Sequence, residues 1–577
     1  MSGSNAEDIA HVKSLGLGVD DDNQPAPENV PTGAPTEDTN QTWGWNGVDH
    51  RSKHNFFDVA PTLNHRLPEL SRNSICGNAL VHLFLTLFSK PFLENILLLA
   101  TNKNLQDNEK VTLGELLRFF GLWFFLATTA GYARRDFFSS LAINVKYGAP
   151  YRLNEYISRN RFEQILQALS YTLKETPTYL DRFWEVRDMI DHWNSNMEKV
   201  FKCGYITRLD ESMSSWMNRW TCPGWMFVPR KPRPFGNEYH TICCGLSGIL
   251  FGMELVEGKD RPKELPSPPA NKKTTELLLN LCKSMAGTGK IVVLDSGFCV
   301  LAALVELKKI GVYAHAVIKK RRYWPKHIPG EAIENHFKDK AVGSVDCLKG
   351  TLNNEPFNVF VMKEPEYTMK LMATYGSLTQ HPNGKIQHRK VGDKSHEFRY
   401  TRPFSDHFKY RHLVDDHNNL RHSTPTFEDT WVTHRWPNRV FAFLLAVTEV
   451  NLYLWLRYKV WSRSNETTPT LHQFRKQLAF ALIDNKYIVR DEEEQRVATR
   501  IGKQSHIHRT CPSYARKFEH GKWDLTSKSK YQQHICRQLN CNRQTRTYCS
   551  CCPGHWMCKQ CFPKHLEEVF TSDSSSH

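Results

Sequence analysis

A run of four apolar residues, Ile291-Val-Val-Leu294, marks the clearest alternation of hydrophobic and polar segments in the chain. Three of the four are β-branched, which predicts a strand buried on both faces. Apolar residues then recur at helical spacing over 301–309, and 312–318 is again apolar. The pattern predicts strand, helix and strand, with Asp295 at the end of the first strand. A carboxylate there either faces a ligand at the sheet edge or caps the following helix.

From about 60 to 200 the pattern is helical, with apolar positions on one face of each segment. Helices are predicted over 77–101, 161–173 and 181–201, and residues 112–115 have the sequence of a capping box that opens another. The apolar stretch 119–132 is too short to cross a bilayer, which needs about 20 residues. It predicts a core helix, and no transmembrane helix is expected.

The period changes at 205, where a short strand is predicted to end in Asp210 and Glu211. Residues 240–256 then predict two strands joined at Ser247-Gly248, and 275–285 predicts a helix leading into the strand at 291–294. Strand with acid, hairpin, helix, strand with acid, helix and strand is the outline of a ribonuclease-H-like fold. The predicted fold class is therefore α/β, with a ribonuclease-H-like core.

Residues 319–400 interrupt this order and predict later core strands, at 357–362 and 369–374, together with an insertion. A third acid, Asp415, lies at a predicted helix start and is followed by Asp416. An apolar helix over 440–458 and a basic helical stretch over 470–483 come next.

Charge is distributed unevenly along the chain. The net charge is +16, but the first forty residues hold eight acids and one lysine, a balance of −7, so the remainder carries +23. Such a surplus favours a polyanionic partner, above all nucleic acid, over a merely soluble basic protein. Residues 1–55 have almost nothing to bury and are predicted to be disordered.

Several basic residues are candidates for contacts with DNA. A proline-stiffened segment over 228–234 suits phosphate contact. The basic run at 319–322 is either a nuclear-localisation or DNA-contact cluster, or a solvated loop. The candidate DNA-binding residues are Arg230, Lys231, Arg233, Lys319, Lys320, Arg321, Arg322 and Arg435.

Cysteine use points to metal binding in a reducing compartment. Residues 1–18 lack the basic start and apolar core of a signal peptide, and eight of the sixteen cysteines lie beyond residue 510. The tail reads Cys536-x4-Cys541-x7-Cys549-x2-Cys552-x5-Cys558-x2-Cys561-x3-His565. This spacing favours two tetrahedral zinc sites over a disulfide cluster.

An interleaved arrangement assigns the tail ligands to two ions. The first ion would take Cys536, Cys541, Cys558 and Cys561. The second would take Cys549, Cys552 and His565, with His555 or His534 as the fourth ligand, which leaves Cys551 spare. The same cross-brace serves ubiquitin ligases, histone readers and proteins that bind DNA ends.

Five motifs together carry a family resemblance. Leu-Asp210-Glu211-Ser-Met, Arg-Lys-Pro-Arg-Pro-Phe-Gly236, Val-Leu-Asp295-Ser-Gly-Phe, Val-Asp415-Asp416-His-Asn418 and Arg435-Trp-Pro resemble those of piggyBac-type transposases in order and spacing. The resemblance covers about 60–565. It implies a nuclear, homodimeric enzyme that cuts and joins double-stranded DNA at TTAA sites. It also implies a ribonuclease-H-like core, a split dimerisation and DNA-binding region around it, and a C-terminal zinc domain.

Matched residue by residue, the resemblance makes Asp210, Asp295 and Asp415 the catalytic acids, holding two Mg²⁺ ions. The family usually has a further Asp where this chain has Asn418, which offers an oxygen but no charge. Asp416 would point about 100° away on the same helix. Carboxylates suit this chemistry because paired Mg²⁺ ions stabilise both the entering and the leaving oxygen of a phosphodiester.

The expected domain plan follows from these assignments. It comprises a disordered tail (1–55), a helical region in two parts (56–204 and 421–500), the core with its insertion (205–318, 319–400 and 401–420), a linker (501–529) and a zinc domain (530–570). Two other functions stay open. A domesticated DNA-binding protein would have lost catalysis, and a zinc-finger adaptor or ubiquitin-ligase-like protein would leave the three acids unexplained.

Overall fold

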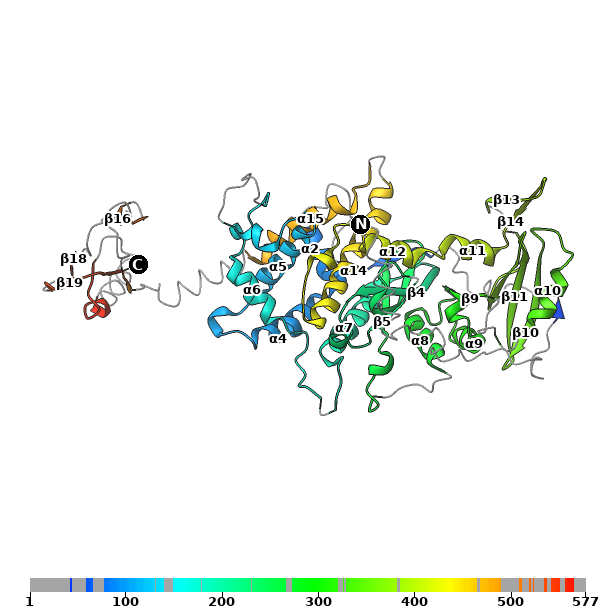
Figure 1. Cartoon of the computed structure of the whole chain (residues 1–577), viewed down its shortest axis with the longest axis horizontal. Helices are drawn as coiled ribbons and strands as arrows, with labels where there is room; N and C mark the ends of the chain where they lie inside the picture. Colours follow the sequence, from blue (N-terminus) through cyan, green and yellow to red (C-terminus); the bar gives the residue numbers. More distant parts are fainter. Residues whose placement is uncertain are drawn as a thin grey trace, which may run out of the picture. The chain divides into compact units, whose positions relative to one another are not determined.

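The computed structural model divides the chain into two compact units, 1–486 and 487–577, which are treated separately (Figure 1). The residues it describes are 42–43, 59–65, 77–129, 131–139, 149–177, 179–229, 231–265, 272–319, 325, 328–380, 384–463, 467–488, 508–510, 518–519, 522–523, 534–536, 541–549 and 556–564.

Helices from both ends of the larger unit build one helical body. α2 (Gly77–Phe88) and α5 (Leu113–Leu126) pack against α14 (Trp436–Lys459) and α15 (Leu471–Ile483). Figure 1 shows these four helices side by side although more than 300 residues separate the two pairs. α6 (Arg159–Ala168) and α7 (Trp184–Val200) belong to the same part. The helical pattern at both ends of the sequence therefore belongs to one core.

The contact between α5 and α15 depends on a glycine. A Cβ on Gly121 would lie 2.8 Å from both the Ala479 carbonyl oxygen and the Ile483 nitrogen, closer than side-chain atoms approach backbone. Aromatic rings fill the space beside this contact, with Trp123 stacked on Trp431 at 4.5 Å between ring centroids. The absence of a side chain at Gly121 thus permits the close approach of two helices that are distant in sequence.

The prediction of a single helix over 77–101 is wrong, because the chain bends by 77° between α2 and the helical segment 90–102. Ser89 adopts φ 75°, and its hydroxyl oxygen accepts a hydrogen bond from the Phe92 nitrogen at 3.3 Å. Pro91 then opens α3 (Lys90–Phe92), which runs through a π-helical turn, η4 (Leu93–Leu97), into α4 (Leu98–Asn102). The apolar periodicity continues through the bend and does not reveal it.

α14 is long and apolar enough to cross a bilayer, unlike the shorter stretch considered from sequence, but its apolar window is wholly buried in the protein. Glu449 on this helix pairs with Arg475 on α15 at 2.6 Å, and both side chains are buried. Arg475 also donates to the carbonyl oxygens of Ala127, at 3.0 Å, and Pro425. This buried arginine joins four segments of the helical body.

The predicted α/β core is confirmed as a mixed sheet. Its strands are β1 (Thr42–Trp43), β4 (Ile206–Ser215), β5 (Met226–Phe227), β6 (Phe235–Cys244), β7 (Leu250–Leu255), β8 (Ile291–Leu294), β9 (Tyr313–Ile318), β10 (Val345–Leu352), β11 (Glu355–Lys363) and β12 (Thr368–Ala373). They lie in the order β1-β10-β11-β12-β9-β8-β4-β6-β5, with β7 also paired to β6. β4, β8 and β9 are parallel, and the other pairs are antiparallel.

Helices connect and cover this sheet. α8 (Lys273–Cys282) leads into β8, and α9 (Leu301–Lys309) crosses from β8 to β9, as the sequence pattern predicts. α10 (Gly330–Phe337) and the hairpin of β13 (Ile386–Val391) and β14 (Lys394–Arg399) belong to the region predicted as an insertion. α11 (Arg402–Tyr410) and α12 (Leu413–Arg421) then return the chain to the sheet, and α13 (Phe427–Thr430) leads towards α14.

Two details of the sheet differ from the predictions. β4 does not end at Asp210 and Glu211 but continues to Ser215, because antiparallel pairing with β6 extends to the Ser215–Gly236 pair. Within the tail predicted to be disordered, β1 pairs antiparallel with β10. Both features arise from pairing with distant strands, which local composition does not report.

The smaller unit contains short antiparallel pairs. β15 (His508–Thr510) pairs with β20 (Thr547–Cys549), β16 (Phe518–Glu519) with β17 (Lys522–Trp523), and β18 (His534–Ile535) with β19 (Gln544–Thr545). Cys536, Met557 and Cys558 form its described hydrophobic cluster. The described residues of this unit bury few apolar side chains, so a bound metal would be a further source of stability for it.

The buried pair in the helical body yields a stability prediction. We expect Arg475→Met to lower stability by about 3–5 kcal/mol, because it leaves the Glu449 carboxylate buried without its partner. Removing both charges, in Glu449→Leu/Arg475→Met, should recover most of that loss. Thermal unfolding midpoints of the full chain test this, with the exposed neighbour Lys476→Met as the control. Equal midpoints for Arg475→Met and Lys476→Met would refute the role of the pair.

Candidate active site and cysteine cluster

Two of the predicted acids follow adjacent positions on neighbouring parallel strands. Leu209 of β4 pairs in register with Leu294 of β8, so Asp210 and Asp295 come next on the two strands. Asp210 lies in mid-strand and is buried, whereas Asp295 stands where β8 ends and begins the short turn η12 (Ser296–Phe298). The parallel register therefore brings together two carboxylates that are 85 positions apart.

The third acid comes from the helix packed against β4. Asp415 lies in the first turn of α12, and α12 contacts β4. Burial and the nearby charge of Asp210 together raise the pKa of Asp415. Like-charge coupling of this kind requires the two carboxylates to be neighbours. All three predicted acids thus belong to one region, at the junction of β4, β8 and α12.

Asn418 connects this helix to the strand. Its side-chain nitrogen donates to the Glu211 carbonyl oxygen at 3.3 Å, and its side-chain oxygen accepts from Arg421 at 3.3 Å. Both ends of the amide are therefore used. A carboxylate at this position would lose the donor and would face the Glu211 carbonyl oxygen.

Arg421, which the sequence analysis did not single out, fastens α12 in place. Its side chain is buried, forms an ion pair with Glu428 of α13 and donates to the Met213 carbonyl oxygen of β4 at 2.6 Å. The Ser214 hydroxyl donates to Glu428 at 2.9 Å. Phe443 of α14 lies 4.6 Å from the guanidinium. Four elements thus meet at one arginine. In the sequence, its position six residues after Asp415 is the one signal that places it near the site.

Positive side chains accompany the acids. Arg208, two residues before Asp210 on the same face of β4, pairs with its carboxylate. Burial raises the pKa of Asp210, but the Arg208 charge and hydrogen bonds outweigh it and leave that pKa below its usual range. Lys231 lies 3.3 Å from Glu211, and Lys319 lies 3.6 Å from Asp295. Burial and the Asp210 charge raise the pKa of Glu211 to about 7.

The acids suit a divalent cation in chemistry, since carboxylate oxygens are the ligands that Mg²⁺ prefers. Burial first, and then repulsion from Asp210, raise the pKa of Asp415, and a bound cation would relieve that repulsion. Over the described part of the chain, however, they do not form a compact ligand group; the four-cysteine group in the smaller unit is the one of that kind.

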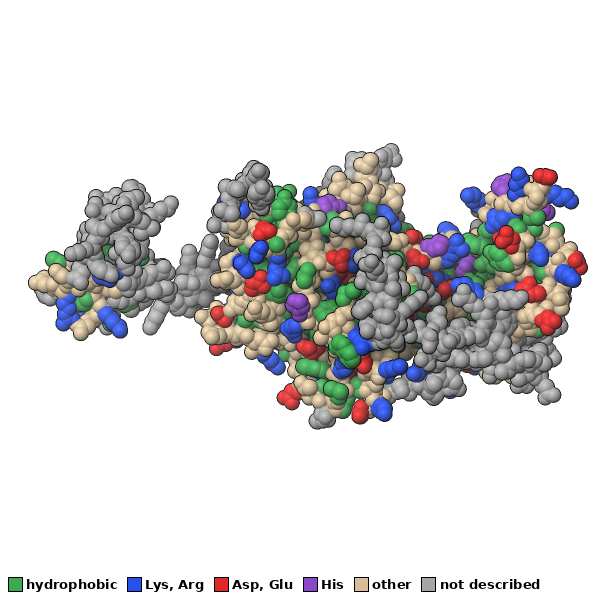
Figure 2. Space-filling model, viewed as in Figure 1, with side chains coloured by type: hydrophobic (Ala, Val, Ile, Leu, Met, Phe, Trp, Pro, Cys, Tyr) green, Lys and Arg blue, Asp and Glu red, His purple; other side chains and the backbone are tan. Residues whose placement is uncertain are grey.

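The predicted DNA-binding residues have mixed placements. Arg230, Lys320, Arg321 and Arg322 lie outside the described residues. Lys231 and Lys319 face the acids, as given above. Arg233 makes two 2.6 Å hydrogen bonds to Asp429, and Arg435 donates to the Leu169 carbonyl oxygen at 3.0 Å. On the face shown in Figure 2, basic and acidic side chains are interspersed.

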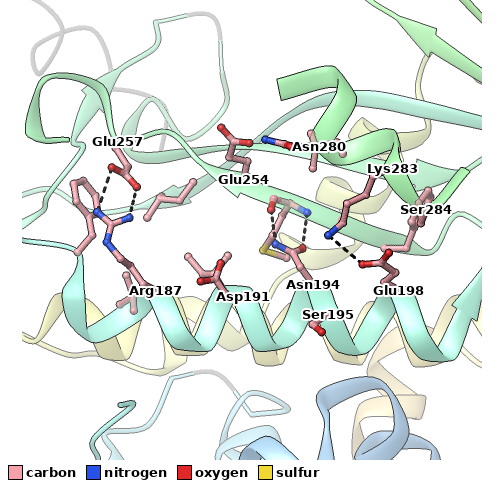
Figure 3. A pocket seen from close by; sticks show the side chains of 18 residues that line it. Arg187, Asp191, Asn194, Ser195, Glu198, Glu254, Glu257, Asn280, Lys283 and Ser284 are labelled. Atoms are coloured by element: carbon pink, nitrogen blue, oxygen red, sulfur yellow. Dashed lines mark hydrogen bonds and ion pairs between the residues drawn. The ribbon is translucent and has the colours of Figure 1, made fainter. Parts of the chain in front are cut away.

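A cavity of about 440 Å³ lies away from the acids, between α7, β7 and α8 (Figure 3). Asn194 of α7 makes two hydrogen bonds to the Met253 backbone, at 2.8 and 3.0 Å, and so covers the edge of β7. Ion pairs of Arg187 with Glu257 and of Lys283 with Glu198 lie at its rim. None of the three predicted acids lines this cavity. Its lining includes Asn194, whose bonds to Met253 protect the edge of β7.

A pair of buried histidines lies on β9 and α11, the elements that adjoin β8. His315 of β9 and His407 of α11 have ring centroids 5.6 Å apart, and His315 Nδ1 is 2.8 Å from the Tyr375 hydroxyl. Burial and the Arg208 charge lower the pKa of His407 to about 3, and burial also lowers that of His315. Both rings are therefore neutral at physiological pH.

In the smaller unit, four of the predicted zinc ligands converge. The sulfur atoms of Cys536, Cys541, Cys558 and Cys561 all lie within 4.8 Å of one another. Burial raises the pKa of Cys558, but hydrogen bonds from Cys561 and Cys541 outweigh it and lower that pKa to about 6. A thiolate is the form that binds zinc, so this group could hold one ion.

The second predicted ligand set lies outside the described side chains. It comprises Cys549, Cys552, His565 and either His555 or His534. The convergence of Cys536 with Cys558 nevertheless matches the interleaved order, in which the first and third ligand pairs share an ion. The assignment of the second ion stays a prediction.

A mixed sheet with acids on neighbouring parallel strands, and a third acid on a helix packed against it, defines a ribonuclease-H-like nuclease core. A match to a protein family specifies which class of nuclease this is. Residues 80–453 match the family model described as Transposase IS4, so the chain belongs to this transposase family. It is an enzyme class that depends on a divalent metal.

One solved structure supports the fold over nearly the whole chain. It is a cryo-EM structure of a piggyBac transposase synaptic complex with hairpin DNA, matched with a TM-score of 0.54 and 15% identity, over 90% of this chain and 100% of that one. No curated protein matches. The resemblance inferred from the motifs is thus confirmed at the level of family and fold.

The cysteine cluster yields a prediction on metal content. We expect Cys558→Ala to lower the zinc bound to the full, reduced chain by about one ion, because a tetrahedral site loses a ligand. Cys551→Ala, which the spacing leaves out of both ligand sets, is the control. Elemental analysis of the purified proteins measures the change. Unchanged zinc in Cys558→Ala would exclude this site.

The buried histidines yield a prediction on pH. His407 has a folded pKa of about 3 and an ordinary one near 6.5, so the unfolded chain takes up a proton first as the pH falls. Its contribution to stability is present above about pH 6.5 and declines by at most about 1.4 kcal/mol per pH unit below it. Thermal midpoints between pH 7 and 5 should fall less in His407→Gln than in the parent. The exposed His412→Gln should follow the parent.

Proposed function

We propose that this chain is a cut-and-paste DNA transposase that cleaves and joins phosphodiesters with Asp210, Asp295 and Asp415. The observation that carries the proposal is the parallel register, which sets Asp210 beside Asp295, with Asp415 on the helix packed against the same strand. Three acids from distant segments, two on neighbouring strands and one on a helix packed against the sheet, are what phosphoryl transfer with divalent ions requires. Family membership supports the same reaction.

The roles of the residues follow from their positions. Asp210, Asp295 and Asp415 would hold two Mg²⁺ ions, which when bound stabilise charge on the entering and leaving oxygens. Arg208 keeps the buried Asp210 ionised, since its charge holds the pKa of that carboxyl low. Lys319 lies at Asp295, where its ammonium would meet a phosphate oxygen of the substrate.

Asn418 has a structural role, because its side-chain amide links α12 to β4. The family's usual acid is absent here, but the amide makes two contacts that a carboxylate could not reproduce together. We therefore do not take Asn418 as a sign of lost catalysis. The domesticated DNA-binding protein, the alternative left open by the sequence, is therefore not favoured.

The partners and location follow as further parts of the proposal. The substrate is double-stranded DNA, with element ends cut and TTAA sites joined, and the enzyme acts as a homodimer in the nucleus, apart from any membrane. The surplus of +23 beyond the acidic first forty residues supports a polyanionic partner. The cysteine-rich tail would hold two zinc ions and bind DNA ends.

Replacing the acids tests the proposal. We expect Asp210→Asn, Asp295→Asn and Asp415→Asn each to lower DNA nicking by orders of magnitude, because each removes a charged ligand. Binding to DNA should change little, since phosphate contacts are expected from basic side chains and not from the acids. A plasmid carrying the native element ends, incubated with Mg²⁺ or Mn²⁺, measures nicking and excision.

Two variants serve as comparisons. Asp416→Asn alters the exposed acid next to Asp415 and should leave nicking unchanged. Asn418→Asp should lower the thermal midpoint and not raise nicking, because it breaks the contact with the Glu211 carbonyl oxygen. Full activity in Asp295→Asn would return Asp295 to the role of a helix cap. An inert parent in both metals would establish the domesticated protein.

A further inference from the structure

The turn that follows β4 presents two large apolar side chains to solvent. Met217 is 71% exposed and Trp220 is 76% exposed. Single apolar residues on a surface are ordinary. Here two lie three residues apart, and one of them is the most exposed tryptophan among the described residues. The turn includes a short 3-10 helix, η8 (Arg219–Thr221).

The backbone of this turn is fixed by hydrogen bonds. The Asn218 side-chain oxygen accepts from the Trp220 nitrogen at 3.0 Å, and the Trp216 indole donates to the Thr221 hydroxyl at 3.0 Å. Arg182, just before α7, donates to the Trp220 carbonyl oxygen at 3.1 Å. Trp216 is buried and anchors the turn. The exposed indole therefore stands on a rigid base, and little conformational entropy is lost when a ligand contacts it.

A guanidinium lies against this indole. The Arg219 side chain is 4.2 Å from the centre of the Trp220 ring. An aromatic plane beside a cation suits an unpaired nucleobase, because the base stacks on the indole while the cation attracts the adjoining phosphate. The chemistry of the pair thus matches single-stranded or unpaired nucleic acid.

The turn directly follows the strand that carries Asp210. β4 carries Asp210 and leads through Ser215 directly into the turn. Ser215 is about 17 Å from Asp210 at the usual strand rise. That span corresponds to about five nucleotide steps along one DNA strand.

We propose that Trp220, supported by Arg219, is a stacking platform for an unpaired base of the DNA substrate. This inference rests on the proposed function, since it assigns a substrate contact to the same site. A protein partner fits less well, because two side chains offer far less than the roughly 1,000 Å² of a specific protein interface. The platform selects DNA whose bases are unpaired a few nucleotides from the cleaved bond.

Binding to matched probes tests the platform. The full, zinc-loaded chain is titrated with a native-end duplex containing a three-nucleotide unpaired stretch five nucleotides from the cleavage position, and with the fully paired duplex. A 2-aminopurine in the unpaired stretch reports stacking by loss of fluorescence. We expect the parent to prefer the unpaired probe and to quench its fluorescence. Trp220→Ala should lose roughly 5- to 150-fold in affinity for that probe alone and should not quench.

The controls separate stacking from other effects. Trp220→Phe keeps an aromatic plane and should retain most of the preference, and Tyr367→Ala removes another exposed aromatic and should behave like the parent. Equal binding and quenching by Trp220→Ala and the parent would overturn the platform, as would a parent without preference. A change in oligomeric state by light scattering, with unchanged DNA binding, would assign Trp220 to a protein contact instead. If the parent nicks DNA and Asp295→Asn does not, any of these failures leaves the proposed function intact.

Discussion

The buried ion pair of Arg421 with Glu428 is the interaction on which the site depends. It lies where β4, α12, α13 and α14 meet, and Arg421 also donates to the Met213 carbonyl oxygen of the strand that carries Asp210. Two charges buried together are costly to separate, because either alone would remain without compensation. The pair therefore fastens α12, which carries Asp415, to β4, which carries Asp210. The buried pair of Glu449 with Arg475 likewise joins α14 to α15 in the helical body.

Local sequence patterns predicted what is local in the structure. The apolar run Ile291–Leu294 and the helical spacing of Leu301–Lys309 reappear as β8 and α9 with the same bounds. The alternation of strands and helices predicted the order of the core, and the resemblance supplied the acids. The spacing of the cysteines predicted an interleaved first site, and Cys536, Cys541, Cys558 and Cys561 converge accordingly.

The features that sequence did not predict are set by partners far along the chain. The bend at Ser89 leaves the apolar pattern intact, and the extension of β4 to Ser215 depends on pairing with β6. Arg421 and Arg475 look like ordinary surface residues in their local sequence, yet both are buried. Each is paired with a glutamate on another helix, which the local sequence does not show. Asn418 looked like a missing ligand, but its amide joins α12 to β4. Position in the fold decides these roles, and residue type alone does not.

The two cations beside the acids differ in how easily they can move away from their carboxylates. Arg208 is buried with Asp210, so its charge stays whatever binds. Lys319 lies at the end of β9, half exposed, 3.6 Å from Asp295. A flexible lysine can exchange a carboxylate for a phosphate at small cost. Arrival of DNA would therefore draw Lys319 towards the backbone and expose Asp295 for a divalent ion. Substrate and metal are then expected to bind cooperatively. Lys319 opposes the metal while it pairs with Asp295, and it favours the DNA when it moves to a phosphate.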